Sequence, residues 1–186
     1  MNIHASITPI DEATQQARVD LAAAYRLIHR LGLDESIYTH SSVRLPGTHD
    51  RFLINPYGMR FEEVTASNLV TVDVDGKVID DPLGLGINPA GFTIHSAIHA
   101  ARHDVLCVLH THTVAGVAVS CQKDGPQPPN QWSMQFTHRT AYRDYESIAP
   151  DLSERERLGG DASAKLVLIL HNQGRWPCRR RAGGRR

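Results

Sequence analysis

The sequence predicts a single layered α/β domain. Segments with a helical spacing of apolar residues alternate along the chain with segments that read as strands, and this alternation is typical of helices packed on a sheet. The chain has 186 residues, which is enough for one compact domain with a sizeable core. Its hydrophobic content of 41% and charged content of 22% are ordinary for a globular protein.

The first helix is predicted from Asp11 to about Leu31, after a loose arm of residues 1–10. Asp11 is a good N-cap because its carboxylate can accept a hydrogen bond from a first-turn amide. Gly32 stands where a C-terminal cap would end the helix. One apolar face is formed by residues at helical spacing: Ala17, Leu21, Ala24, Ile28 and Leu31.

Four strands are expected next. Residues 41–45 and 51–55 flank the turn Pro46-Gly47-Thr48. Residues 69–73 alternate like a half-buried strand, and Asp75-Gly76 then turns the chain into a strand at 77–79, a strong hairpin signal.

The second half of the chain continues the alternation. After a Gly- and Pro-rich loop at 81–91, we expect a helix from Phe92 to Arg102, a buried strand from Val105 to His112, and a helix at 115–120. The remaining predicted segments are an irregular loop at 122–133, a charged helix start at 151–158 and a last buried strand at 165–170.

The composition favours a cytoplasmic protein. The longest apolar runs have five residues, against roughly 20 for a membrane span, and the N-terminus does not resemble a signal peptide. Cys107, Cys121 and Cys178 are too few and too widely spaced for a disulfide framework or a metal knuckle. Within its apolar strand, Cys107 reads as a core residue.

Two histidines carry the first indication of chemistry. His110 and His112 flank Thr111 in a predicted strand, and side chains two apart in a strand point to the same face. Two imidazoles at a strand's end can chelate Zn²⁺ or a similar divalent ion. The alternative is a pair of hydrogen-bonded histidines at the end of a strand.

Three further histidines form a stripe on the preceding helix. His95, His99 and His103 are spaced i, i+4, i+8 and lack the Glu of the HExxH metalloprotease motif. We interpret them as partly buried residues that pack the helix on the sheet or bond to loop backbone.

The stretch NPAGFTIHSAIHAARHDVLCVLHTHTVAGVAVS, residues 88–120, closely resembles the centre of class II aldolase/adducin domains. Other stretches agree in the same order: RLGL (30–33), SVRLPG (42–47), FLINPYG (52–58), LVTVDVDGKV (69–78) and AKLVLILHNQG (164–174). Segments in the right order are more specific than any one of them, and the resemblance covers about residues 15–174.

The resemblance implies a three-layer α/β/α fold around a mixed, mainly antiparallel central sheet, and a homo-oligomer, often a tetramer. Enzymes of the family cleave or form carbon–carbon bonds in sugar phosphates, or epimerise them. Three histidines hold Zn²⁺, which stabilises an enediolate, and a carboxylate moves the proton. The resemblance implies that His110 and His112 are two of these metal ligands. The adducins lack these residues, are not enzymes and bind the actin cytoskeleton.

Three positions and one loop depart from the family pattern. The catalytic Glu corresponds here to Gly91, and two phosphate-binding serines correspond to Pro89 and Ala90. A Gly-rich phosphate loop is replaced by residues 36–40, SIYTH. A sugar phosphate is therefore not the expected substrate. Tyr38, His40 and Tyr57 lie in the altered loops and could bind a different ligand.

The third zinc ligand of the family corresponds to Gln173, in the triplet Asn172-Gln173-Gly174. Glutamine is a poor zinc ligand beside imidazole. His171 lies two residues earlier on the same strand face, about 6.6 Å away by strand rise, and would substitute only if the strand shifted.

The arginine-rich segment 175–186 holds six arginines and no acid. One coding of Gly174–Cys178 becomes Gly-Leu-Leu-Ala-Val, a strand typical of the family, when a single base is added. We therefore expect residues 11–174 to form a truncated domain and the tail to be out-of-frame and disordered. The alternative is a genuine basic tail that binds nucleic acid or membrane. We expect neither nucleic acid nor a membrane to be a partner of this chain.

Three functions remain open at this point. The first is a divalent-metal-dependent carbon–carbon lyase, with Zn²⁺ or a similar ion, acting on a small non-phosphorylated carbonyl substrate. The second is a non-catalytic, adducin-like binding protein. The third is a truncated, inactive product of either type.

Overall fold

The computed structural model describes residues 11–123, 131–143 and 165–170. Its elements in chain order are α1 (Glu12–Arg30), β1 (His40–Arg44), β2 (Arg51–Ile54), the 3-10 helix η1 (Phe61–Glu63), β3 (Val70–Asp73), β4 (Val78–Asp80), α2 (Pro89–Ala101), β5 (Cys107–His110), α3 (Val114–Ser120), α4 (Gln131–Met134), β6 (Thr140–Arg143) and β7 (Val167–Leu170). The predicted arm at 1–10, the helix start at 151–158 and the tail at 175–186 lie outside the described residues.

The central sheet has five strands in the order β4-β3-β2-β1-β5, and every neighbouring pair is antiparallel. The strands β6 and β7 form a separate pair, which is parallel. The strand pairings are thus mixed and mainly antiparallel, as the family resemblance implies.

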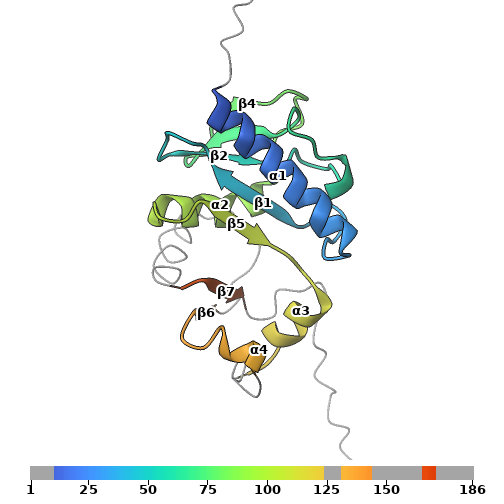
Figure 1. The fold of residues 1–186 in the computed structure, drawn as a ribbon, viewed down its shortest axis with the longest axis vertical. Helices are drawn as coiled ribbons and strands as arrows, with labels where there is room; N and C mark the ends of the chain where they lie inside the picture. Colours follow the sequence, from blue (N-terminus) through green and yellow to red (C-terminus); the bar gives the residue numbers. More distant parts are fainter. Residues whose placement is uncertain (1–10, 124–130, 144–164, 171–186) are drawn as a thin grey trace, which may run out of the picture.

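Helices cover both faces of the five-stranded sheet (Figure 1). Leu53 of β2 packs into a cluster with Leu21 and Tyr25 of α1. Its neighbour Phe52 belongs to a second cluster, against which Phe92 of α2 packs. Because successive side chains of a strand point to opposite faces, β2 separates two apolar layers, and the predicted three-layer α/β/α architecture is confirmed.

The helix α1 has the ends predicted for it. The Asp11 carboxylate accepts a hydrogen bond from the Thr14 amide at 2.9 Å, and Gly32 has a φ of 66° just past the helix. The fully buried Tyr25 fixes α1 to the sheet, because its hydroxyl accepts from the Ser41 amide at 2.7 Å and donates to Asn55 at 2.8 Å.

The helix α2 begins at Pro89, three residues before the predicted start at Phe92. Asn88 caps it by accepting a hydrogen bond from the Ala90 amide at 3.1 Å. Proline suits the first helical position because its fixed φ is helical and its missing N–H is not needed there. The prediction had assigned this Gly- and Pro-rich segment to a loop.

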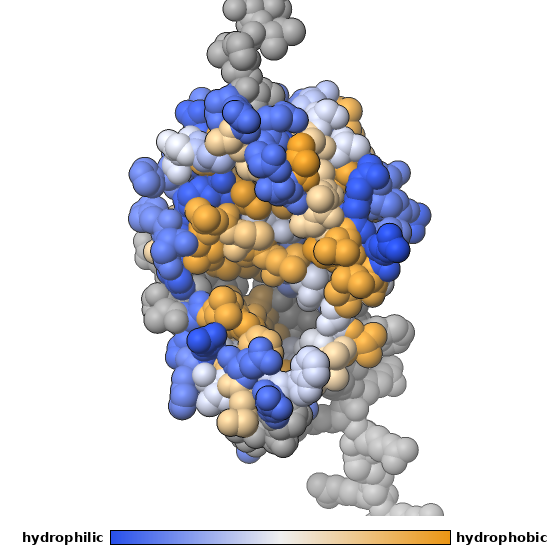
Figure 2. All heavy atoms as spheres, viewed as in Figure 1, coloured by the Kyte–Doolittle hydropathy of each residue, from blue (hydrophilic) through white to orange (hydrophobic). Residues whose placement is uncertain are grey.

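The prediction that β5 is buried was wrong. Leu106 and Leu109 are 67% and 53% exposed, and Cys107 is exposed rather than a core residue. The physical reason is that, among the described residues, β5 lies at the edge of the sheet and pairs with β1 alone. Figure 2 shows apolar side chains gathered across the middle of this face of the molecule.

The last predicted strand is present as β7, but it is half-buried rather than buried. Its parallel partner β6 was not predicted. No helix among the residues described above is long and apolar enough to cross a bilayer.

Candidate metal centre and its buried histidines

The pairing of β1 with β5 brings three histidines together. His40 lies directly opposite His110 in the antiparallel register, and directly opposite side chains share one face of a sheet. The ring centroids of His40 and His110 are 5.0 Å apart, and those of His110 and His112 are 4.7 Å apart. This histidine cluster lies at the end of β5.

The two histidines that the sequence singled out face each other through their Nε2 atoms, which are 3.1 Å apart. The strand ends at His110, so His112 lies beyond it rather than within it. The two imidazoles nevertheless lie next to each other, and both residues are partly shielded from solvent.

Glu35 holds the ring of His112. Its Oε2 atom lies 2.5 Å from the His112 Nδ1 atom. A carboxylate only accepts hydrogen bonds, so Nδ1 carries the proton and Nε2 keeps its lone pair. A carboxylate that fixes a histidine in this way is the usual support of a metal-bound imidazole.

The geometry of this pair fits two ligands of one metal ion. With metal–nitrogen bonds of about 2.0–2.1 Å and tetrahedral angles, two imidazole nitrogens stand about 3.3 Å apart. The observed 3.1 Å is close to that value, and it is also an ordinary hydrogen-bond distance, so it fits the hydrogen-bonded pair that the sequence left as the alternative. The sequence-derived candidates for a third ligand, Gln173 and His171, lie outside the described residues.

One other group of ligand atoms converges within the described ranges. His29, Asp34 and Glu62 bring their ligand atoms within 4.8 Å of one another. The His29 Nδ1 atom lies 2.9 Å from a carboxylate oxygen of each acid. His29 Nδ1 is hydrogen-bonded to Asp34, whereas Glu62 Oε2 is shielded and makes no hydrogen bond among the described residues. The sequence did not single out these residues.

Behind the histidine cluster runs a chain of hydrogen bonds into the protein interior. His40 Nδ1 lies 3.0 Å from His95 Nε2, and His95 Nδ1 lies 2.5 Å from the Ser42 hydroxyl. That hydroxyl also lies 2.8 Å from His99 Nε2. We call His40, His95, Ser42 and His99 the histidine relay. All four residues of the relay are buried.

Burial keeps the relay histidines neutral. It lowers the pKa of His40 to about 4, with a smaller effect from nearby His112. It also lowers the pKa of His99 to about 3, helped by the positive charge of Arg44. The pKa of His95 is depressed well below its ordinary value, first by burial and then by the neighbouring histidines.

The packing role predicted for the helix histidines is confirmed for two of the three. His95 and His99 are fully buried between α2 and the sheet, although they bond to side chains rather than to loop backbone. His103 is exposed and lies against His49, with ring centroids 5.7 Å apart.

Gly91 lies against His40. A Cβ atom on Gly91 would stand 2.3 Å from His40 Nε2. The imidazole therefore fills the space that any side chain at position 91 would need. His40 was expected in an altered loop, but it begins β1 and is 4% exposed, whereas Tyr38 and Tyr57 are exposed.

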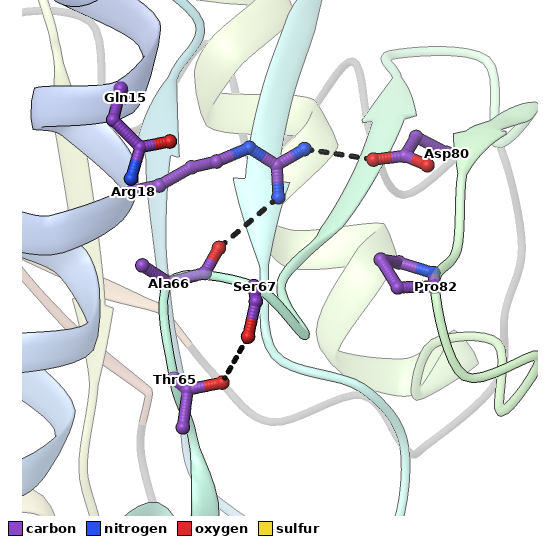
Figure 3. A pocket seen from close by; sticks show the side chains of 7 residues that line it. All are labelled: Gln15, Arg18, Thr65, Ala66, Ser67, Asp80 and Pro82. Atoms are coloured by element: carbon purple, nitrogen blue, oxygen red, sulfur yellow. Dashed lines mark hydrogen bonds and ion pairs between the residues drawn. The ribbon is translucent and has the colours of Figure 1, made fainter. Parts of the chain in front are cut away.

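A separate hollow of about 500 Å³ opens beside α1 (Figure 3). The positively charged side chain in its lining is Arg18. The Arg18 guanidinium donates to the Leu69 carbonyl at 3.0 Å and to the Asp80 carboxylate at 2.9 Å. Arg18 is buried and donates to main-chain carbonyls as well as to the exposed carboxylate of Asp80, so we interpret the arginine as structural. The hollow is lined by Gln15, Arg18, Thr65, Ala66, Ser67, Asp80 and Pro82.

Together, the three-layer fold and the paired histidines at the end of β5 define a layered α/β domain with a candidate metal centre. The family model of the class II aldolase and adducin N-terminal domain matches residues 19–176. The chain therefore belongs to the class II aldolase and adducin family.

Individual relatives agree with this assignment. A protein of the aldolase class 2 type from Caulobacter vibrioides is 54% identical over 165 residues, which is 89% of this chain and 64% of that protein. Rat alpha-adducin is 42% identical over 88% of this chain and 22% of its own length. The chain thus spans less than two thirds of these relatives.

Two solved structures have the same fold. An aldolase II superfamily protein from Pseudomonas syringae is 57% identical with a TM-score of 0.86, over 89% of this chain and 66% of that one. The L-fuculose 1-phosphate aldolase of Glaciozyma antarctica is 30% identical with a TM-score of 0.75, over 90% of this chain and 67% of that one.

Proposed function

We propose that this chain is a divalent-metal-binding lyase domain that acts on a small carbonyl compound without a phosphate group. The observation that carries the proposal is the pair of Nε2 atoms, 3.1 Å apart, on His110 and His112, together with the carboxylate of Glu35 behind His112. Both imidazoles would hold the ion, which is Zn²⁺ or a similar divalent metal.

The roles of the chain's own residues follow from these contacts. When bound, the ion supplies Lewis acidity for a carbonyl oxygen and for the negative charge that develops on it. Glu35 keeps the His112 Nδ1 atom protonated, so that the Nε2 lone pair points to the ion. His110 completes the pair from the end of β5, where cross-strand pairing with β1 fixes its position.

The first turn of α2 argues against a phosphate. A phosphate group is commonly held by several backbone amides at a helix N-terminus. Here Pro89 has no N–H, and the Ala90 amide already donates to the Asn88 side chain at 3.1 Å. Too few donors remain for three phosphate oxygens.

A substrate screen tests this function. The metal-loaded chain is incubated with hydroxyketones and hydroxy acids, each with and without a phosphate, and released carbonyl fragments are measured. We expect metal-dependent cleavage of phosphate-free compounds, lost in the double variant His110→Ala/His112→Ala and kept in His103→Ala. Turnover of sugar phosphates in preference to phosphate-free compounds, or activity that survives the double substitution, would overturn the proposal.

Adducin-like binding without catalysis is the second candidate. It is favoured by Gly91, which offers no carboxylate for proton transfer beside the histidine cluster, and by the similarity to alpha-adducin. Co-sedimentation with filamentous actin separates the two candidates, because the lyase proposal expects the chain to remain in the supernatant.

The proposal includes a cytoplasmic homo-oligomer. The exposed leucines of the β5 region support an association between copies, because large apolar patches on a surface commonly mark interfaces. Light scattering coupled to size-exclusion chromatography measures the oligomeric state, and a monomer at micromolar concentration contradicts this part.

A further inference from the structure

Three side chains from separate elements converge beside the C-terminal end of α1. His29 lies in the last turn of α1, Asp34 lies in the loop that follows, and Glu62 belongs to η1. Their ligand atoms all lie within 4.8 Å of one another. The His29 Nδ1 atom lies 2.9 Å from one oxygen of each carboxylate. We call these three residues the His29 site.

One hydrogen cannot serve both carboxylates of this site. A carboxylate only accepts hydrogen bonds, and an imidazole nitrogen carries at most one hydrogen, whatever the charge of the ring. The His29 Nδ1 atom is hydrogen-bonded to Asp34 Oδ2. Glu62 Oε2 is shielded from solvent and makes no hydrogen bond among the residues that the structure describes. A shielded oxygen without a donor is uncommon, and a bound cation accounts for it.

The surrounding charges favour a cation. The two carboxylates match the charge of a divalent ion, and the C-terminal end of a helix carries a partial negative charge that adds to theirs. Arg60 contacts the other oxygen of Glu62, since its Nη1 atom lies 3.3 Å from Oε1. The arginine therefore orients this carboxylate and leaves Oε2 directed toward His29.

We propose that the His29 site binds one divalent transition-metal ion of the Zn²⁺ or Mn²⁺ type, through His29 Nδ1, Asp34 Oδ2 and Glu62 Oε2. An imidazole nitrogen suits Zn²⁺, and carboxylate oxygens suit Mn²⁺. With metal–ligand bonds of about 2.0–2.2 Å, neighbouring ligands of one ion stand roughly 2.9–3.5 Å apart. The two separations of 2.9 Å lie in this range. They are also hydrogen-bond distances, so the unpartnered oxygen of Glu62 carries the proposal.

Binding requires a change of tautomer at His29. The ion takes the place of the hydrogen on Nδ1, and a neutral imidazole keeps its one hydrogen on Nε2. The side chains of His29 and Glu62 are 41% and 36% exposed, so solvent reaches the site. Water would therefore complete the coordination of the ion.

The ion would have a structural role. It would join α1, the loop after α1 and η1, which are otherwise linked here by the single hydrogen bond between His29 and Asp34. The same loop carries Glu35, the residue next to Asp34, and the Glu35 carboxylate contacts His112. The His29 site thus lies near the candidate metal centre without sharing a ligand with it, and a test must count the two ions separately.

Electron paramagnetic resonance of Mn²⁺, titrated into the full chain, counts bound ions against free ones. The wild type is compared with Glu62→Gln, which keeps the size of the side chain and removes its charge. Glu12→Gln, in the exposed first turn of α1, is the matched control. We expect Glu62→Gln to bind one Mn²⁺ fewer than the wild type, or to bind it at least tenfold more weakly, and Glu12→Gln to bind as the wild type does. Equal Mn²⁺ binding in the wild type and Glu62→Gln would overturn the proposal.

Thermal unfolding separates a metal site from a simple ion pair of His29 with both acids. Without metal, the melting temperature of Glu62→Gln should equal or exceed that of the wild type, because the variant removes a charge that lacks a partner. Mn²⁺ at about 100 times its Kd should raise the melting temperature of the wild type by about 5–10 °C more than that of Glu62→Gln. A lower melting temperature of metal-free Glu62→Gln, with the same Mn²⁺ response in both proteins, would establish the ion pair instead.

The His29 site and the candidate metal centre fail separately, because the double variant His110→Ala/His112→Ala removes only the latter. Loss of Mn²⁺ in Glu62→Gln, with none in the double variant, would contradict the proposed function and leave the His29 site standing. Loss of Mn²⁺ in the double variant, with none in Glu62→Gln, would contradict this inference alone.

Discussion

The imidazole of His40 occupies the space of the side chain that Gly91 lacks, and a Cβ atom at position 91 would stand 2.3 Å from His40 Nε2. Real Cβ contacts are never this short, so one of the two groups must move if glycine is replaced. Positions 40 and 91 are therefore coupled, although 51 residues separate them along the chain.

A double-mutant cycle measures this coupling. Gly91→Ala in the wild-type chain should destabilise it by about 1–3 kcal/mol, the usual cost of overpacking a core. In a His40→Ala background the space is free, and Gly91→Ala should be neutral or stabilise the helix by about 0.5–1 kcal/mol, because alanine is the better helix former. Urea unfolding of the four proteins gives the interaction energy. Equal effects of Gly91→Ala in both backgrounds would show that the two positions are independent.

Glu35 should set the metal affinity of His112 without touching the ion. Glu35→Gln keeps the size of the side chain but removes the charge that stabilises the His112 Nδ1–H, and support of this kind is commonly worth 10- to 100-fold in metal affinity. Isothermal titration with Zn²⁺ measures the change. Glu12→Gln, in the exposed first turn of α1, is the control. An unchanged affinity in Glu35→Gln would remove Glu35 from the metal centre.

The relay should make the protein less stable in mild acid. The pKa of His99 is lowered to about 3 in the folded protein, while an unfolded histidine titrates near 6.5. The unfolded chain therefore binds more protons below pH 6.5, so the stability from a neutral His99 is complete above that pH and falls as the pH drops toward 3. Each such histidine contributes a slope of up to about 1.4 kcal/mol per pH unit.

The variant His99→Gln isolates this contribution. Between pH 6.5 and 4.5 its melting temperature should fall less steeply than that of the wild-type protein. His103→Gln alters an exposed histidine on the same helix and should keep the wild-type slope. Identical slopes in all three proteins would contradict the assignment of His99 as a neutral buried base.

Much of the fold could be predicted because the signals are local. The Asp11 cap, the Gly32 terminus of α1 and the Asp75-Gly76 hairpin each depend on residues a few positions apart, and all three are present. The exposure of β5 could not be read in the same way. An apolar run fits a central strand as well as an edge strand, and only the strand order distinguishes them.

The candidate site was predictable only where its residues are close in sequence. His110 and His112 are two apart, so the sequence indicated that their side chains lie close together, although His112 lies beyond the end of β5 rather than on a face of the strand. Glu35 lies 77 residues from His112, and Ser42 lies 57 residues from His99. No periodicity connects such pairs. Nothing in the sequence around Ser42 indicates that its hydroxyl will lie between the buried imidazoles of His95 and His99.

Metal content is the most direct measure of the central claim, that His110 and His112 hold a divalent ion. The purified chain is dialysed against Zn²⁺ and analysed for zinc beside three variants, His110→Ala, His103→Ala and His29→Ala. We predict two ions per chain in the wild type and in His103→Ala, one ion in His110→Ala, and one in His29→Ala, which keeps the ion of His110 and His112. Equal zinc in the wild type and His110→Ala would contradict the account, and loss in His29→Ala alone would leave the metal only with Asp34 and Glu62.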